Sequence, residues 1–137
     1  MRYKNRMKTI QSSYFAFLLI CVCSAGCSRS SLLINADKSY EGRTINLRVG
    51  DGVKLSLEEN PTTGYRWEFL SRPEPNCVIV TDEYVAKENG LAGSGGVHNW
   101  DFRAVDKGTC AVSLVYQRPW EKDTAPAQKF ALTMVVK

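Results

Sequence analysis

Residues 44–58 read Thr-Ile-Asn-Leu-Arg-Val-Gly-Asp-Gly-Val-Lys-Leu-Ser-Leu-Glu. Apolar and polar side chains alternate on both sides of a central Gly-Asp-Gly, which is a turn signal. Because successive side chains of a strand point to opposite faces, this period of two predicts half-buried strands over 44–49 and 53–58, joined by a tight turn. Their inward faces are Ile45, Leu47 and Val49, then Val53, Leu55 and Leu57.

The same alternation recurs along the rest of the chain, and no window sustains a helical stripe. It predicts further strands, separated by turn signals, over residues 65–70, 78–85, 97–105, 110–116 and 129–136. The inward face of 78–85 is ambiguous. About seven strands in about 100 residues favour an all-β fold, an immunoglobulin-like antiparallel β-sandwich. A small β-barrel is the alternative.

The charge of the chain is concentrated at its N-terminus. Residues 1–26 hold four of the 18 basic side chains and none of the 14 acidic ones, so the remainder carries 14 of each. A neutral domain gives no electrostatic reason to expect a nucleic-acid partner. The length of 137 residues bounds the chain to one domain.

The basic N-terminus is followed by an apolar run over 14–23 and then by Ser24-Ala25-Gly26. Ten apolar residues span only about 15 Å as a helix, half of a bilayer core, so we expect a signal peptide over 1–26. Ala25-Gly26-Cys27 is similar to the end of a bacterial lipoprotein signal, although Ser24 stands where leucine is usual. An ordinary signal peptidase would cut at the same bond.

These features predict an exported lipoprotein, held in the periplasm or on the cell surface. Cys27 would carry the lipid, residues 27–43 would form a tether, and the lipid would be the only membrane contact. Cys77 and Cys110 then remain as an even pair in an oxidising compartment. A disulfide between them and two buried free thiols both stay open at this point.

The predicted strand order also places three connections. If consecutive strands reverse direction, the connections over 59–64, 86–96 and 117–128 emerge at one end of the sandwich. The last two are longer than a hairpin requires, and long connections in compact domains often carry function.

These connections contain Asn60-Pro61-Thr62-Thr63-Gly64-Tyr65, Gly93-Ser94-Gly95-Gly96 and Arg118-Pro119-Trp120. In this order they resemble the three signature motifs of the chagasin family of cysteine peptidase inhibitors: NPTTG followed by an aromatic residue, GxGG, and RPW. The resemblance covers residues 45–136 and contains no substitution within the motifs. It implies an immunoglobulin-like sandwich over 44–137.

The resemblance also implies a function, which is the reversible blockade of papain-like cysteine peptidases by a wedge of these three loops. The partners would be papain, cathepsins or a secreted bacterial homologue, met by a monomer without a cofactor. The residue types suit that role, because proline stiffens a turn, glycine admits close backbone approach, and arginine and tryptophan are enriched in binding hot spots.

An enzyme is difficult to build from this sequence. His98 is the only histidine, it shares a strand face with Trp100, and we expect it to pack beside the second loop. Glu58 and Glu59 are adjacent on a strand, so they point to opposite faces and make poor acid–base partners. No Cys-x-x-C occurs, and no metal ligands stand at usable spacing. The alternatives are a non-inhibitory, surface-tethered binding module and a structural subunit of an envelope complex.

Overall fold

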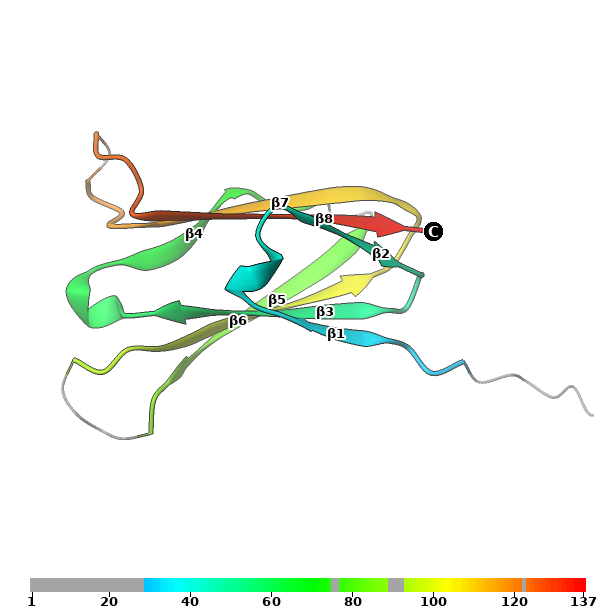
Figure 1. The fold of residues 1–137 in the computed structure, drawn as a ribbon, viewed down its shortest axis with the longest axis horizontal. Helices are drawn as coiled ribbons and strands as arrows, with labels where there is room; N and C mark the ends of the chain where they lie inside the picture. Colours follow the sequence, from blue (N-terminus) through cyan, green and yellow to red (C-terminus); the bar gives the residue numbers. More distant parts are fainter. Residues whose placement is uncertain (1–28, 75–76, 89–92, 122) are drawn as a thin grey trace, which may run out of the picture.

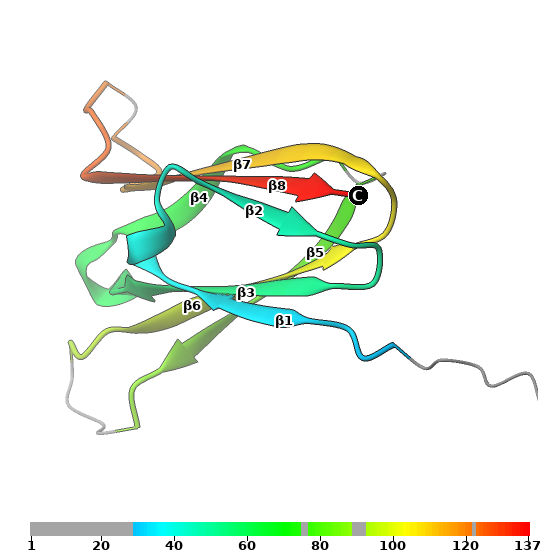
Figure 2. The same cartoon turned by 45° about the vertical axis from the view of Figure 1, so that its right-hand side comes forward.

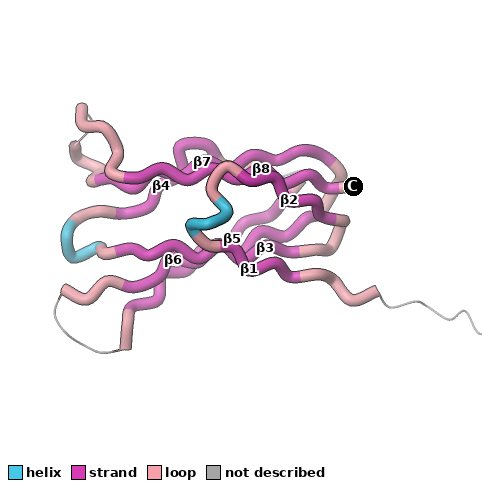
Figure 3. The backbone as a smooth tube through the Cα atoms, in the orientation of Figure 1, coloured by secondary structure: helices cyan, strands magenta, loops and turns pink. Residues whose placement is uncertain are grey.

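A computed structural model describes residues 29–74, 77–88, 93–121 and 123–137. Within them, two four-stranded sheets pack face to face as a β-sandwich (Figure 1). The strands are β1 (Leu33–Ala36), β2 (Arg43–Leu47), β3 (Gly52–Glu59), β4 (Arg66–Ser71), β5 (Val78–Ala86), β6 (Gly96–Ala104), β7 (Gly108–Gln117) and β8 (Gln128–Val136). Two 3-10 turns, η1 (Lys38–Tyr40) and η2 (Pro61–Thr63), are the helical segments that Figure 3 colours cyan.

One sheet has the strand order β1-β3-β6-β5, and the other has the order β2-β8-β7-β4. Four pairings are antiparallel, but β1 pairs with β3 and β2 pairs with β8 in parallel. The sandwich is therefore confirmed, whereas a purely antiparallel topology is wrong. The parallel pairs arise because the chain crosses from one layer to the other at η1, so that β1 and β2 join different sheets (Figure 2).

The seven strands expected from the alternation are all present, and the eighth, β1, was not predicted. Its four residues carry too little pattern to recognise, since only Ala36 is buried. Asp51 holds the start of β1, because its Oδ1 accepts from Leu32 N at 2.9 Å while its Oδ2 accepts from Arg48 N at 2.8 Å. These bonds lower the pKa of Asp51, so their contribution is present above the ordinary carboxyl range and is lost in acid.

Two corrections concern the N-terminal part of the domain. Residues 33–43, expected to lie in a tether over 27–43, contain β1 and η1 and belong to the sandwich. Val49 was expected to face inward, but β2 ends at Leu47 and Val49 is 52% exposed. The signal peptide and Cys27 lie outside the described residues. No helix in the described part of the chain is long and apolar enough to cross a bilayer.

The core is built from the inward rows that the alternation predicts. Val53, Leu55 and Leu57 are buried on β3, opposite a buried row from the other sheet that contains Leu114, Phe130, Leu132 and Met134. Phe69 and Trp100 meet edge to face across the two sheets, with ring centroids 6.4 Å apart. Burying one such large apolar side chain stabilises the fold by about 1.5–3 kcal/mol.

Strand β5 lies at the edge of its sheet, which explains its ambiguous pattern. Val78 is buried and Val80 is half-buried, but the residues beyond them are exposed. An edge strand covers the core only where the facing sheet reaches it, so its alternation fades along its length.

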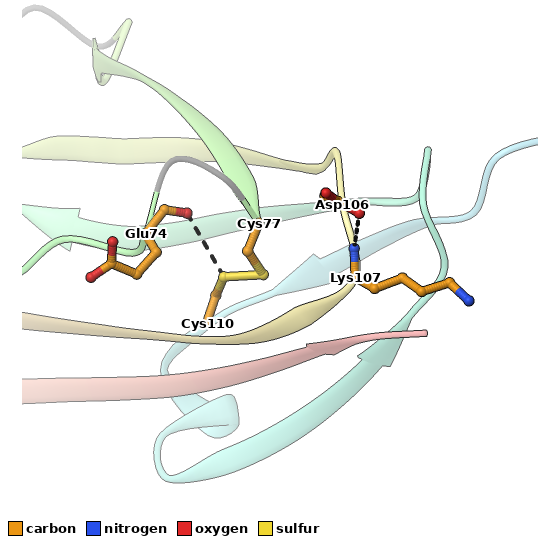
Figure 4. Close-up of a disulfide and its surroundings, with 5 residues drawn as sticks. All are labelled: Glu74, Cys77, Asp106, Lys107 and Cys110. Atoms are coloured by element: carbon orange, nitrogen blue, oxygen red, sulfur yellow. Dashed lines mark hydrogen bonds between the residues drawn. A yellow bond between two sulfur atoms is a disulfide. The ribbon is translucent and has the colours of Figure 1, made fainter.

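Cys77 and Cys110 meet at the start of β5 and β7, and a disulfide joins them (Figure 4). Their Cα atoms are 6.3 Å apart, and both side chains are buried. Cys110 faces inward with Val112 and Leu114, as its place in the alternation predicts. The bond links the two sheets at the end of the sandwich that lies away from the three long connections (Figure 1).

Reduction of this disulfide is expected to lower the free energy of unfolding by about 3–4 kcal/mol, because the unfolded chain regains the entropy of the closed loop. Urea unfolding with and without reductant measures the difference. The Cys77→Ala/Cys110→Ala double variant is the control and should not respond to reductant. Alkylation of Cys77 and Cys110 in the unfolded, unreduced protein would contradict the bond.

Candidate functional site

Three connections emerge together at one end of the sandwich, on the left of Figure 1. We name them loop one (residues 60–65, between β3 and β4), loop two (residues 87–95, between β5 and β6) and loop three (residues 118–127, between β7 and β8). The expected topology of the site is therefore correct, because strand reversal brings the three motifs to the same end. Residues 89–92 and 122 lie outside the described residues.

Loop one is a turn that its own side chains hold closed. Asn60 caps η2, since its Oδ1 accepts from Thr62 N at 3.3 Å and from Thr62 Oγ1 at 2.6 Å. Thr63 Oγ1 donates to Asn60 O at 2.7 Å. Both threonine hydroxyls thus donate their single proton to a hydrogen bond within the loop. Toward a partner protein, each hydroxyl oxygen can then only accept a hydrogen bond. Pro61 occupies the first position of η2, where its fixed φ suits the turn.

Loop two packs directly against loop one. Asn60 Nδ2 donates to Gly93 O at 3.1 Å. A Cβ atom on Gly95 would lie 2.6 Å from Glu59 O, and one on Gly96 would lie 2.2 Å from Val85 O. The glycines were expected to let the backbone approach a peptidase. In the structure, glycine is needed at positions 95 and 96 because the backbone there packs closely against the carbonyl groups of Glu59 and Val85.

Loop three closes over the other side of loop one. Arg118 Nε donates to Thr63 O at 3.1 Å, and its guanidinium lies 4.7 Å from the centre of the Tyr65 ring. Arg118 Nη1 also donates to Glu121 at 2.9 Å, and this bond raises the pKa of Arg118 above its ordinary value, so the brace stays charged. Arg118 therefore holds loops one and three together as well as offering a cation at the surface.

Trp120 lies at the exposed end of this arrangement, next to Pro119. Its ring covers Gly64, where a Cβ atom would lie only 2.5 Å from Trp120 Cη2. Gly64 also has a φ of 84°, a left-handed conformation that glycine adopts without strain. Trp120 nevertheless remains 66% exposed. It is not a lid on the core, and loop three carries a large apolar side chain turned to solvent.

Tyr116, on β7, supports loop one from below, and sequence reasoning did not single it out as a site residue. Asn60 N donates to Tyr116 Oη at 3.0 Å. The Tyr116 ring contacts those of Tyr65 and Trp67, at centroid distances of 5.4 and 5.1 Å. The available signal was its position as the last inward residue of 110–116, because a tyrosine at the edge of a core needs a partner for its hydroxyl.

A second missed feature is a row of ionisable side chains just beneath loops one and two. Glu59 is only 6% exposed, and its Oε2 accepts from Trp67 N at 3.1 Å. The same oxygen lies 2.9 Å from His98 Nδ1. His98 Nε2 lies 3.1 Å from Asp82 Oδ2, and its ring stacks on Trp100 at 4.1 Å. The packing expected for His98 beside Trp100 is present, as are the opposite directions of Glu58 and Glu59.

The three loops project from the sandwich, and a hollow of about 260 Å³ lies at their base, with Glu59, Asn60 and Gly95 among its lining residues. A cavity of about 590 Å³ lies at the opposite end, where Arg29, Leu32, Arg48 and Lys137 are among its lining residues. Among the described residues, no group of three histidine, cysteine or acidic side chains is arranged to hold a metal ion. Exposed loops that brace one another suit insertion into a cleft of another molecule.

Gly95→Ala is expected to cost about 1–3 kcal/mol of unfolding free energy, because the added methyl must push loop two away from the Glu59 carbonyl. Urea unfolding measures this cost, and amide NMR shifts should move in residues 60–64. Gly52→Ala is the matched control, since its Cβ would meet only the tip of the Leu33 side chain, at 3.2 Å, and the Phe102 carbonyl at 3.4 Å. Equal costs for both variants would contradict the tight packing of loop two.

Comparison with known proteins agrees with this geometry. Chagasin from Trypanosoma cruzi is 31% identical over 99 residues, which are 69% of this chain and 90% of that protein. The crystal structure of the Entamoeba histolytica cysteine protease inhibitor EhICP2 has the same fold, with a TM-score of 0.68 at 21% identity over 80% of this chain and 99% of that one. PbICP-C, solved in complex with falcipain-2, gives a TM-score of 0.55 at 20% identity, covering 79% of this chain and 93% of that one.

The model of the family described as Chagasin family peptidase inhibitor I42 matches residues 46–134, a range that contains all three loops. The chain therefore belongs to the chagasin family of peptidase inhibitors.

Proposed function

We propose that this chain is a reversible inhibitor of papain-like cysteine peptidases and that its three loops enter the active-site cleft together. The observation that carries the proposal is the mutual bracing of loops one, two and three around Asn60 and Arg118, with Trp120 left exposed at the edge. Membership of the inhibitor family supports it. The structure of PbICP-C with falcipain-2 gives a related fold in complex with a cysteine peptidase.

Loop one is suited to block a peptidase without being cleaved. A peptidase cleaves a segment that lies extended in its cleft, whereas residues 61–63 form a 3-10 turn closed by Gly64. Hydrogen bonds from Thr62 and Thr63 already fix this turn, so docking costs little further conformational entropy.

Loops two and three would add area and affinity on either side of loop one. Gly93, Ser94 and Gly95 present backbone that can approach an extended strand of the partner closely. Trp120 offers a flat apolar surface of the kind that dominates interface energies. Three loops of this size fit an interface of about 800 Å² per partner. Because the domain beyond residue 26 is neutral, salt should change the association rate only modestly.

We extend the proposal to an N-terminal lipid on Cys27 and to residence in the periplasm or on the cell surface. The segment that precedes β1 starts at the end of the sandwich opposite the three loops (Figure 1). An anchor there would turn the loops away from the membrane and toward an approaching peptidase. The relatives named above come from eukaryotes, so a bacterial source is part of this proposal.

The test of inhibition is a titration of active papain and of a cathepsin with the purified protein. We expect competitive, reversible inhibition at a one-to-one ratio, and an intact inhibitor by mass spectrometry after prolonged incubation. Full peptidase activity at micromolar excess would overturn the proposal. Binding to another partner without inhibition would support the non-inhibitory module instead.

Trp120→Ala is expected to weaken papain binding by about 2 kcal/mol or more, mainly through faster dissociation, because a large apolar contact is lost. Thr63→Ala should cost less, since the lost group is small. Surface plasmon resonance gives both rate constants. Leu70→Ala is the control, because Leu70 is 70% exposed but lies near the far end of β4. Unfolding of the domain by Trp120→Ala would contradict the exposed position of the ring.

Cys27→Ser is expected to release the protein into the soluble fraction, or to leave its leader uncleaved, because serine cannot form the thioether that carries the lipid. Detergent partitioning of the wild type and the variant measures the change. Intact mass shows the modification directly, and an unmodified Cys27 at the mature N-terminus would refute the anchor. Cys23→Ser is the matched control within the apolar run.

A further inference from the structure

We propose that His98 is a positioning residue, which in its protonated form holds loops one and two in their binding arrangement, so that the chain inhibits more strongly in acid than at neutral pH. The inference rests on the proposed inhibition of papain-like peptidases and adds a regulation to it. It is drawn from the row formed by Glu59, His98 and Asp82, which we call the acid–histidine row.

The row crosses three adjacent strands on the inner face of one sheet. His98 lies on the central strand β6, opposite Leu57 of β3 and Tyr84 of β5. Glu59 is two residues beyond Leu57 and Asp82 is two residues before Tyr84, so each carboxylate approaches the ring diagonally. The row therefore links both neighbouring strands to β6, through Glu59 at the end of β3 and Asp82 in the middle of β5.

Each ring nitrogen of His98 lies within hydrogen-bond distance of a carboxylate oxygen. Nδ1 lies 2.9 Å from Glu59 Oε2, and Nε2 lies 3.1 Å from Asp82 Oδ2. Ionised carboxylates only accept hydrogen bonds, and a neutral imidazole has a single N–H. Only the imidazolium ring can donate to both oxygens. The ring also stacks on Trp100, with the ring centroids 4.1 Å apart.

Two further charged groups, on and just after β4 of the opposite sheet, lie near the row. Glu68 and Arg72 line a hollow of about 380 Å³ together with Asp82, His98 and Trp100. Gln117 Nε2 donates to Glu68 at 3.0 Å, and Arg72 lies 4.5 Å from the centre of the Phe69 ring. Glu59 and Asp82 contact the ring directly, whereas Glu68 and Arg72 line the neighbouring hollow.

If the His98 ring lost one proton, it would keep its hydrogen bond to Glu59 and lose the one to Asp82. Glu59 is buried and has no solvent to turn to, so the neutral ring would keep its N–H on Nδ1. The lone pair of Nε2 would then face Asp82 Oδ2 at close range. The Asp82 side chain is 49% exposed and can turn to water, which removes this side-chain link between β5 and β6 while their backbone pairing remains.

Strand β5 continues from Asp82 to Ala86 and then leads into loop two. Lys87 N, just after β5, donates to Gly95 O at 3.2 Å, and Gly93 O accepts from Asn60 Nδ2. A shift of β5 therefore acts on the contact between loops one and two. Histidine side chains ordinarily change charge between about pH 5 and 8. The bond from His98 Nε2 to Asp82 needs the charged ring. It therefore strengthens inhibition below this pH range, and the gain is lost as the pH rises through the range.

The experiment measures the inhibition constant for papain from pH 5 to 8 with three forms of the protein: wild type, Asp82→Asn and Glu83→Gln. Ratios between forms cancel the pH dependence of papain itself. An amide at position 82 can accept from the charged ring or donate to the neutral one, so Asp82→Asn should show no histidine-linked change. Glu83→Gln removes the same charge from the neighbouring position on the other face of β5 and is the matched control.

We expect wild type and Glu83→Gln to gain about fivefold to tenfold in affinity over Asp82→Asn between pH 7.5 and 5.5, the low end of coupling between linked sites. The midpoint should coincide with the titration of the single histidine, followed by NMR. The amide signals of Gly93 and Gly95 should move with the same midpoint, which tests the coupling without a peptidase.

A wild-type to Asp82→Asn ratio that stays constant from pH 5 to 8 would overturn the role of His98 and leave the proposed inhibition intact. Stationary Gly93 and Gly95 signals during the histidine titration would also overturn it. Absence of papain inhibition at every pH would instead overturn the proposed function, and the NMR result would still decide whether the row controls the loops.

Discussion

The contact between the two inward faces is the constraint on which the rest of this structure depends. Each strand can bury one row of side chains only, and the rows of the two sheets must meet to exclude water. That requirement fixes which residues of β3 and β6 face Leu114 and Phe130, and hence the register of the strands. Because β3, β5 and β7 all run toward the same end, their connections emerge together (Figure 1). The three loops are neighbours as a consequence of core packing.

At that end the core becomes polar, and the polar residues continue the same inward rows. Glu59 follows Leu57, His98 precedes Trp100, and Tyr116 follows Leu114 in the alternation of their strands. Glu59 bonds to Trp67 N of β4 in the facing sheet, His98 lies within bonding distance of Asp82 on β5, and Tyr116 bonds to Asn60 N of loop one. The loops thus stand on a layer whose polar side chains are paired with one another or with the backbone. Preorganisation of this kind lowers the entropic cost of binding.

Much of this arrangement could be predicted from the sequence. Alternation in rows such as Val53, Leu55 and Leu57 identified seven strands, and strand reversal placed the three motifs at one end. The short strand β1 escaped detection because a single buried residue, Ala36, carries its pattern. The parallel pairings and the exposure of Val49 depend on where the chain crosses between the two sheets. The alternation of apolar and polar residues along one strand carries no information about these crossings. The bonds of Asn60 to Gly93 and of Glu59 to His98 join residues more than 30 positions apart, so only the folded register reveals them.

The central claim is that the three loops act as one surface. Hydrogen exchange of the protein, alone and with saturating papain whose active site is intact, tests it most directly. We predict added protection in residues 60–65, 93–96 and 118–120 together, with the amides of β1 and of the β2–β3 turn unchanged at the opposite end. Protection confined to one loop, or centred on β1 and the β2–β3 turn, would contradict the account.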